Sequence, residues 1–185
     1  MVYKVVRYMN NPILERPANP VPESDFNTPA LHQLVEDMFE TMYASHGIGL
    51  AAPQIDVGQR ITVVDIAAAD KDDEEDDGEE EGAQRRIVLI NPEVILKEGK
   101  QTGEEGCLSI PGFREPVSRA KKTVVRARNV AGEHIEVAAE DLLARAFLHE
   151  IDHLNGILFI NHLSALKRDL IKRKIKKLIR AGEWE

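Results

Sequence analysis

Two histidines four residues apart are the feature of this sequence with the clearest chemistry. They stand in the segment His149-Glu150-Ile151-Asp152-His153. Residues four apart lie on one face of an α-helix, so both imidazoles can bind the same metal ion. Glu150, beside the first ligand, can hold the attacking water and shuttle its proton. Asp152, three residues after His149, is placed to accept a hydrogen bond that fixes the orientation of a ligand.

A metal site needs a third protein ligand, and Cys107 is the strongest candidate because it is the only cysteine. A metzincin-type third histidine is excluded, since Phe159 occupies that position, and the downstream acids Glu183 and Glu185 lie in a basic tail. A lone cysteine is most often a small buried hydrophobic residue. Next to a site with two histidines, a thiolate ligand becomes the stronger interpretation, and the fourth tetrahedral position stays open for water.

Length and composition indicate one domain over residues 1–185. The chain is 43% hydrophobic, which is enough for one core. No stretch approaches the ~18 apolar residues that span a bilayer, and the first residues do not resemble a signal segment. A single cysteine suits a reducing compartment. We therefore expect a cytoplasmic protein with no membrane partner.

The acidity of the chain is concentrated in one segment. The formal net charge is −8, and residues 70–82 contain ten acids and one lysine, a net charge of −9, which leaves +1 for the remainder. A run of this kind cannot bury apolar surface, so we expect an acidic mobile loop at about 69–83. Calcium binding is the alternative, but the ligand spacing of a calcium loop is missing.

Periodicity predicts three helices and several strands. A hydroxyl cap and a proline at Thr28-Pro29 open a helix that ends near Gly47. Residues 141–153 form a helix that is apolar on most sides and therefore central. A helix over about 164–181 carries one basic face and one apolar face, made of Leu166, Leu170, Ile175, Leu178 and Ile179. Strands are expected at 61–66, 87–90, 93–98, 123–129 and 134–138.

The segment around Gly47-Ile48-Gly49 has a possible binding role. Glycines let a backbone approach a ligand closely, and an extended segment can pair with a peptide as an added strand. A turn that stops the preceding helix is the alternative. Gln54 offers an amide donor to a developing oxyanion. Four further histidines have no ligand spacing and are expected at the surface: His32, His46, His134 and His162. Of these, His46 directly precedes the glycine motif, so a place near the site is the alternative for it.

Three motifs together resemble those of the peptide deformylase family, in that family's order and with similar spacing. The resemblance runs from about Val5 to Leu178, and the acidic run departs from it. The motifs are Gly47-Ile48-Gly49-Leu50-Ala51-Ala52-Pro53-Gln54, Glu105-Gly106-Cys107-Leu108-Ser109 and His149-Glu150-Ile151-Asp152-His153-Leu154-Asn155-Gly156.

The resemblance implies an α+β fold of antiparallel β-sheets around a central metal-binding helix, plus an N-terminal helix and a C-terminal helix. It implies removal of the formyl group from N-formylmethionyl nascent peptides, with Fe(II) in the cell and Ni, Co or Zn as substitutes. Gln54 and the Leu108 N–H would stabilise the oxyanion, and Arg119 would pair with Asp152. Ile48, Gly49, Glu105 and Gly106 would hold the peptide, and Leu142, Arg145 and Ala146 would line the methionine pocket.

The resemblance also implies ribosome binding through the basic C-terminal helix, with no sequence-specific nucleic acid partner. Two other functions remain open at this stage. A small zinc endopeptidase would use the same ligands on internal amide bonds. A non-catalytic protein could use the fold to bind peptide ends, but the presence of Cys107, Glu150 and Gln54 argues against it.

Overall fold

The computed structural model describes residues 1–67 and 86–184, so the acidic loop expected at about 69–83 lies outside the described residues. The helices are α1 (Pro29–Ala44), α2 (Asp141–Leu154) and α3 (Ala165–Ala181). The strands are β1 (Gly49–Ala51), β2 (Ile61–Val64), β3 (Ile87–Glu98), β4 (Gln101–Cys107), β5 (Ile110–Arg119), β6 (Lys122–Arg128) and β7 (His134–Glu140). Short 3-10 turns include η3 (Ala52–Ile55) and η5 (Phe159–His162).

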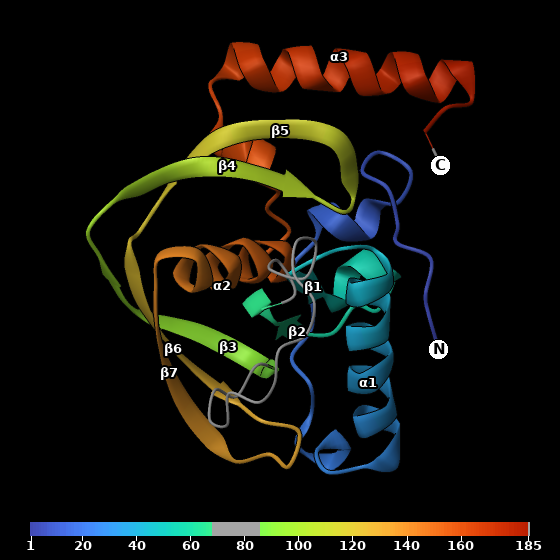
Figure 1. The fold of residues 1–185 in the computed structure, drawn as a ribbon. Coiled ribbons are helices and arrows are strands. Elements are labelled where there is room, and N and C mark those ends of the chain that lie inside the picture. The colour runs from blue at the N-terminus through green and yellow to red at the C-terminus, as the bar shows by residue number, and fades with distance from the viewer. Residues whose placement is uncertain (68–85, 185) are drawn as a thin grey trace, which may run out of the picture.

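The strands form two antiparallel sheets, which confirms the expected α+β class. One sheet has the order β1-β2-β3-β6-β7, and β4 pairs only with β5. Helix α2 lies between them, with the five-stranded sheet on one side and the β4–β5 hairpin on the other (Figure 1). The helix therefore contacts both sheets, and its buried faces decide where the side chains of the site lie.

Helix α1 begins as expected but ends earlier than expected. The Thr28 hydroxyl accepts the Leu31 N–H at 3.3 Å, and Pro29 occupies the first turn. The helix ends at Ala44, and His46 takes the left-handed conformation with φ of 54°. Gly47 is therefore not the residue that reverses the chain. Instead, its N–H bonds to the Met42 carbonyl and closes the last turn.

Helix α2 is central, as predicted. Phe147, Ala144 and Leu154 have no exposed surface, and the helix packs on the sheet through the cluster that contains Val64, Leu89 and Val125. Burial of these apolar side chains stabilises the contact by about 1.5–3 kcal/mol for each large residue. The position of α2 is therefore fixed by packing rather than by its own helix propensity.

The sequence did not indicate β4 and β5. Gly103, Gly106, Pro111, Gly112 and Pro116 interrupt the alternation expected of strands. The pairing is possible because the hairpin stands apart from the larger sheet and each strand has one free edge. The separate strands expected at 87–90 and 93–98 are a single strand, β3, with two register shifts against β6.

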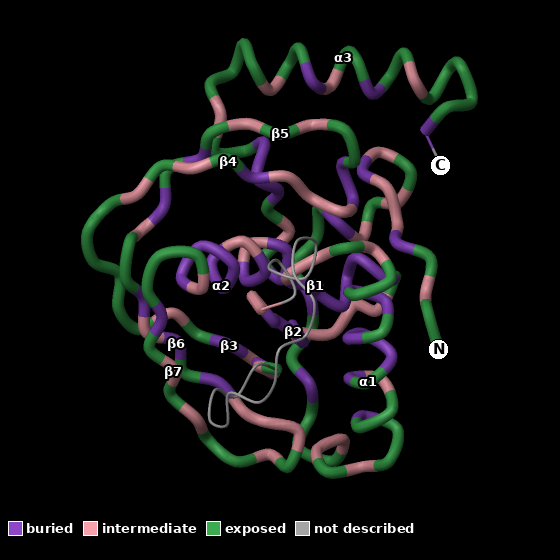
Figure 2. Tube along the Cα trace, in the orientation of Figure 1, coloured by how far each residue is buried: buried purple, intermediate pink, exposed green. Residues whose placement is uncertain are grey.

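Helix α3 packs on the outside of the hairpin, and its apolar face differs from the predicted one. Ser164 caps the helix at the Lys167 N–H. Ile171 and Ile175 are buried, whereas Leu166 is 72% exposed and Leu170 and Ile179 are also exposed. Figure 2 shows α3 as the most exposed helix of the molecule. None of the described helices is long and apolar enough to cross a membrane.

Gly156, just after α2, is a position where only glycine fits. Its φ is 72°, and an added Cβ would lie 2.8–2.9 Å from backbone atoms of Glu15 and Arg16. Gly182, after α3, has a φ of 71° but open space around it. We expect Gly182→Ala to cost about 1–2 kcal/mol for its conformation. Gly156→Ala should cost ~1–3 kcal/mol more for overpacking.

Urea unfolding of both variants measures the difference between them. Equal losses of unfolding free energy would show that the backbone at Glu15 and Arg16 moves aside without cost.

Candidate active site

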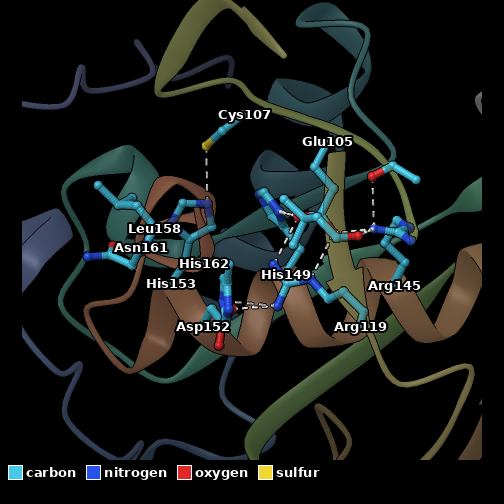
Figure 3. A network of polar contacts seen from close by, with 12 residues as sticks. Glu105, Cys107, Arg119, Arg145, His149, Asp152, His153, Leu158, Asn161 and His162 are labelled. Carbon is cyan, nitrogen blue, oxygen red and sulfur yellow. Dashed lines mark hydrogen bonds and ion pairs between the residues drawn. The ribbon is translucent and has the colours of Figure 1, made fainter. Parts of the chain in front are cut away.

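Three potential metal ligands meet in the centre of the molecule. Cys107 ends β4, and His149 and His153 lie one turn apart on α2. Their ligand atoms all lie within 4.8 Å of one another. Cys107 Sγ is 3.2 Å from His153 Nε2, and Figure 3 shows the two side chains pointing toward one another. The spacing recognised in the sequence therefore does bring the three side chains to one point.

The charges around these three side chains favour the binding of a cation between them. Burial raises the pKa of the Cys107 thiol, but the two histidines outweigh it and hold that pKa well below its usual range. Burial lowers the pKa of His149, but Cys107 and Glu105 raise it to about 10. Negative groups that stabilise a proton also stabilise a metal ion that replaces it. A thiolate and two imidazoles are a set of donors that zinc and iron both accept.

Glu105 orients His149. Its Oε2 lies 3.0 Å from His149 Nδ1, which leaves Nε2 for a metal. Arg119 donates to both Glu105 oxygens, at 2.7 and 2.9 Å, and Arg145 Nη1 donates to Oε1 at 2.7 Å. Burial raises the pKa of Glu105, but Arg119 and His149 overcome this and hold it far below its usual range. Glu105 is therefore a carboxylate that can only accept, so His149 Nδ1 must donate.

Asp152 makes one of its two expected contacts. The predicted ion pair with Arg119 is present at 2.6 Å, and His162 Nε2 lies 2.7 Å from the same oxygen. Asp152 does not bond to His149, because Glu105 already occupies Nδ1. The sequence gave no sign of His162, which comes from η5 and was expected at the surface without a partner. Among the described residues, Asp152 is therefore linked to Glu105 and His149 through Arg119.

Gln54 is held with its amide nitrogen toward Cys107. The side chain is 1% exposed, and its Oε1 accepts the Ala51 N–H at 2.8 Å. This fixes Nε2, which lies 3.6 Å from Cys107 Sγ and 3.4 Å from Ser109 Oγ. An amide donor oriented in this way is available to an oxygen that develops negative charge beside Cys107.

Glu150 is buried without a partner for one of its oxygens. Its Oε2 makes no hydrogen bond among the described residues, and burial raises its pKa. Space for the carboxylate depends on Gly49, because a Cβ there would lie 2.5 Å from Glu150 Oε1. Native proteins rarely leave a buried polar atom unpaired, so this carboxylate is a functional candidate.

A cavity of about 1070 Å³ opens onto these groups. It is lined by all the residues expected to contact a peptide, namely Ile48, Gly49, Glu105, Gly106, Leu142, Arg145 and Ala146. Gln54, Cys107, Leu108, His149 and Glu150 also line it, whereas Arg119, Asp152 and His153 do not. His46 does lie at the cavity, and so do Tyr43, Phe113 and Arg114, which sequence reasoning missed.

The fold and the site together define a metal-dependent hydrolase. A thiolate and two imidazoles can hold the metal, and a buried carboxylate and an amide donor lie next to them on a cavity wide enough for a peptide end.

Comparison with known proteins identifies which hydrolase this is. The family model described as polypeptide deformylase matches residues 2–169. The peptide deformylase of Acidobacterium capsulatum is 53% identical over 184 residues, which cover 100% of this chain and 99% of that protein. The crystal structure of a peptide deformylase from Legionella pneumophila has a TM-score of 0.82 at 39% identity, covering 100% of this chain and 99% of that one.

A third similar structure is the Met-Ala-Ser-bound class I type b peptide deformylase from Acinetobacter baumannii. It has a TM-score of 0.77 at 33% identity and covers 88% of this chain and 99% of that one. The chain therefore belongs to the peptide deformylase family, whose members remove the N-formyl group from the amino-terminal methionine of new polypeptides. The alternative of a small zinc endopeptidase is not favoured.

The buried Arg119–Glu105 pair should contribute strongly to the stability of the fold. Both side chains are 4% exposed, and removal of one partner of a buried pair typically costs about 3–5 kcal/mol. We expect Arg119→Met to lose that much unfolding free energy. Arg126 pairs with Glu136 on the surface, where both are about half exposed, so Arg126→Met should cost at most ~1 kcal/mol.

Urea denaturation of the two variants tests this difference. If Arg119→Met is as stable as Arg126→Met, the charge of Glu105 is balanced by Arg145 and His149 alone.

Proposed function

We propose that Cys107, His149 and His153 hold one divalent metal ion, Fe(II) in the cell, which Ni, Co or Zn can replace. The donor set and the attraction of the site for cations support this. Fe(II) rather than zinc follows from the family resemblance. Bound there, the metal supplies a Lewis acid and lowers the pKa of water.

Glu150 acts as the general base and then as the general acid. Its buried carboxylate, free at Oε2, holds the attacking water and accepts a proton from it. A pKa raised by burial suits this task, because the group must both take a proton and release it near neutral pH. The protonated carboxyl then donates to the amine nitrogen that leaves as the bond to the formyl carbon breaks.

Gln54 Nε2 and the backbone N–H of Leu108 stabilise the oxyanion that forms on the formyl oxygen. The bond from the Ala51 N–H supports the role of Gln54, since it fixes the amide before substrate arrives. Donors that need no reorganisation stabilise a transition state more than a ground state.

The peptide backbone binds along the free edge of β1. This strand is an edge of the five-stranded sheet, and Gly49 lines the cavity. The Ile48 carbonyl accepts the Asp65 N–H, so in the antiparallel register Gly49 turns its N–H and C=O away from β2. Glu105 and Gly106 line the opposite wall. A substrate strand can therefore pair between the two.

The methionine side chain is held by Leu142, Arg145 and Ala146. Arg145 suits an apolar pocket because its charged head is occupied elsewhere. The guanidinium donates to Glu105 and to the carbonyls of Gly103 and Val117. The methylene stem is left as the part available to the substrate. The solved Acinetobacter baumannii complex with Met-Ala-Ser, a peptide beginning with methionine, supports a substrate of this kind.

The unpaired Glu150 carboxylate beside the three ligand atoms is the observation that carries this proposal. We expect Glu150→Gln to keep one metal per chain and to lose formate release by ~10²–10⁴-fold or more. Cys107→Ala should instead lose metal, since two imidazoles remain.

Metal analysis of anaerobically purified protein and a formate-release assay on formyl-Met-Ala-Ser measure both effects. An active Glu150→Gln enzyme would contradict the proposed base, and a Cys107→Ala protein with full metal occupancy would contradict the proposed ligand set.

We also propose that the exposed side of α3 docks the enzyme on the ribosome, in the bacterial cytoplasm where formylated chains emerge. The exposed bases are Lys167, Arg173, Lys174, Lys176, Lys177 and Arg180. Lys167 pairs with Glu115, so the remaining five are available to a polyanion such as ribosomal RNA. Removal of the whole helix is an unsuitable test, because Ile171 and Ile175 belong to the core.

Neutralising Arg173, Lys174, Lys177 and Arg180 to Gln should weaken co-sedimentation with ribosomes at least ~10-fold at low salt, because fewer counterions are released. Formate release from free peptide should not change. A control with four other exposed bases replaced, Lys97, Lys100, Lys121 and Lys122, removes the same charge elsewhere. Equal co-sedimentation of both variants would refute docking through α3.

A further inference from the structure

The N-terminal segment Val6–Tyr8 bridges the two segments that carry the proposed oxyanion donors. The Val6 N–H donates to the carbonyl of Gln54 at 2.8 Å. The Arg7 guanidinium donates through Nη1 to the carbonyl of Leu108 at 2.7 Å. The Tyr8 N–H donates to the carbonyl of Ser109 at 2.9 Å. Three consecutive residues thus hold η3 and the β4–β5 turn in one fixed relation.

The direct polar contacts between η3, which carries Gln54, and the β4–β5 turn are weaker than the three hydrogen bonds from the N-terminal segment. Among the described residues they are those of Gln54 Nε2, which lies 3.6 Å from Cys107 Sγ and 3.4 Å from Ser109 Oγ. Sulfur is a weak acceptor, and 3.4 Å is long for a hydrogen bond to oxygen, so both contacts contribute little. The bonds from the N-terminal segment are 2.7–2.9 Å, and the one from Arg7 has a charged donor, which makes it about twice as strong as a neutral bond.

The segment is itself anchored by the far end of the chain. Trp184 is 6% exposed, and its Nε1 donates to the Tyr8 carbonyl at 2.8 Å. Asn10 returns a bond from Nδ2 to the Trp184 carbonyl at 3.1 Å. The Trp184 ring also meets Phe113, a residue of the cavity wall, edge to face. Residues 8–10 and Trp184 are therefore tied together next to the cavity wall.

We propose that Arg7 is a positioning residue for the deformylation reaction, acting through the Leu108 carbonyl on the place of the Leu108 N–H. The proposal rests on the oxyanion role given to Gln54 and Leu108 above. Oxyanion donors must stay within about 0.5 Å of their productive positions. Leu108 lies in a two-residue turn between strands, and Arg7 is the side chain that ties its carbonyl to the rest of the protein.

Removal of Arg7 should act on the transition state more than on substrate binding. Loss of a whole oxyanion donor costs ~10²–10³ in kcat, so displacement of Leu108 by Arg7→Gln should cost about tenfold. KM for formyl-Met-Ala-Ser should stay within twofold, because the oxyanion forms after binding. Arg7→Lys, which keeps the positive charge and a long side chain with a donor, should recover most of the kcat, whereas the neutral Gln amide ends two bonds short of the guanidinium nitrogens.

Lys4→Gln is the matched control, since it removes one positive charge from an exposed position two residues before this segment, and its kcat should equal that of the parent enzyme. Metal content and the emission of Trp184, the chain's only tryptophan, check that the variants keep the site and the docked segment. Both readings should be unchanged in Arg7→Gln.

The results for the Arg7 and Gln54 variants distinguish a failure of the role given to Arg7 from a failure of the oxyanion assignment on which it rests. A kcat of Arg7→Gln within twofold of the parent, or a loss shared with Lys4→Gln, overturns the role of Arg7. Metal loss, a red-shifted tryptophan emission or a change confined to KM also overturns it, because Arg7 would then serve folding or binding. Gln54→Ala, measured beside it, should lose at least ~10²-fold in kcat. If Gln54→Ala is fully active, the oxyanion assignment itself fails.

Discussion

The buried carboxylate of Glu105 is the group on which the rest of the site depends. It comes from β4, and its partners come from β5 and α2, so one side chain ties the hairpin to the central helix. Two arginines balance its charge and that of Asp152. Without them a carboxylate this deep would take up a proton and could no longer hold His149 Nδ1–H. The orientation of His149, one of the three proposed metal ligands, is thus set by this ion cluster.

The sequence indicated the spacing of the two histidines on α2, but it did not indicate which residue would hold His149, and the reason is physical. Helical spacing is local, so His149 and His153 could be placed on one face, with Glu150 next to the first of them, from the chain alone. The partner of His149 could not be found in this way. Glu105 lies 44 residues away, and Asp152 was nearer in sequence and equally acidic. Only the packing of β4 against α2 decides between the two carboxylates.

The same distinction explains the errors in the fold. The hydroxyl cap at Thr28 and the cap at Ser164 are local signals, and both helices begin where expected. Strands β4 and β5 stabilise each other across the hairpin despite residues that disfavour strands, so their propensities were misleading. In α3 the apolar residues wind around much of the helix, and Ile171 and Ile175 rather than Leu166 face inward because of where the hairpin lies.

Contacts between segments that are far apart in sequence also restrict which residues of the enzyme can be replaced. Residues 6–8 and 184 meet beside the turn that holds Leu108, so both ends of the chain belong to the environment of the site. The two faces of helix α3 have different roles. Ile171, Ile175 and Leu178 close the core beneath it, and its exposed bases remain available to a partner. The outer face can therefore change its charge without altering the inner face, which packs with Trp184 in one apolar cluster and so supports the segment that Trp184 anchors.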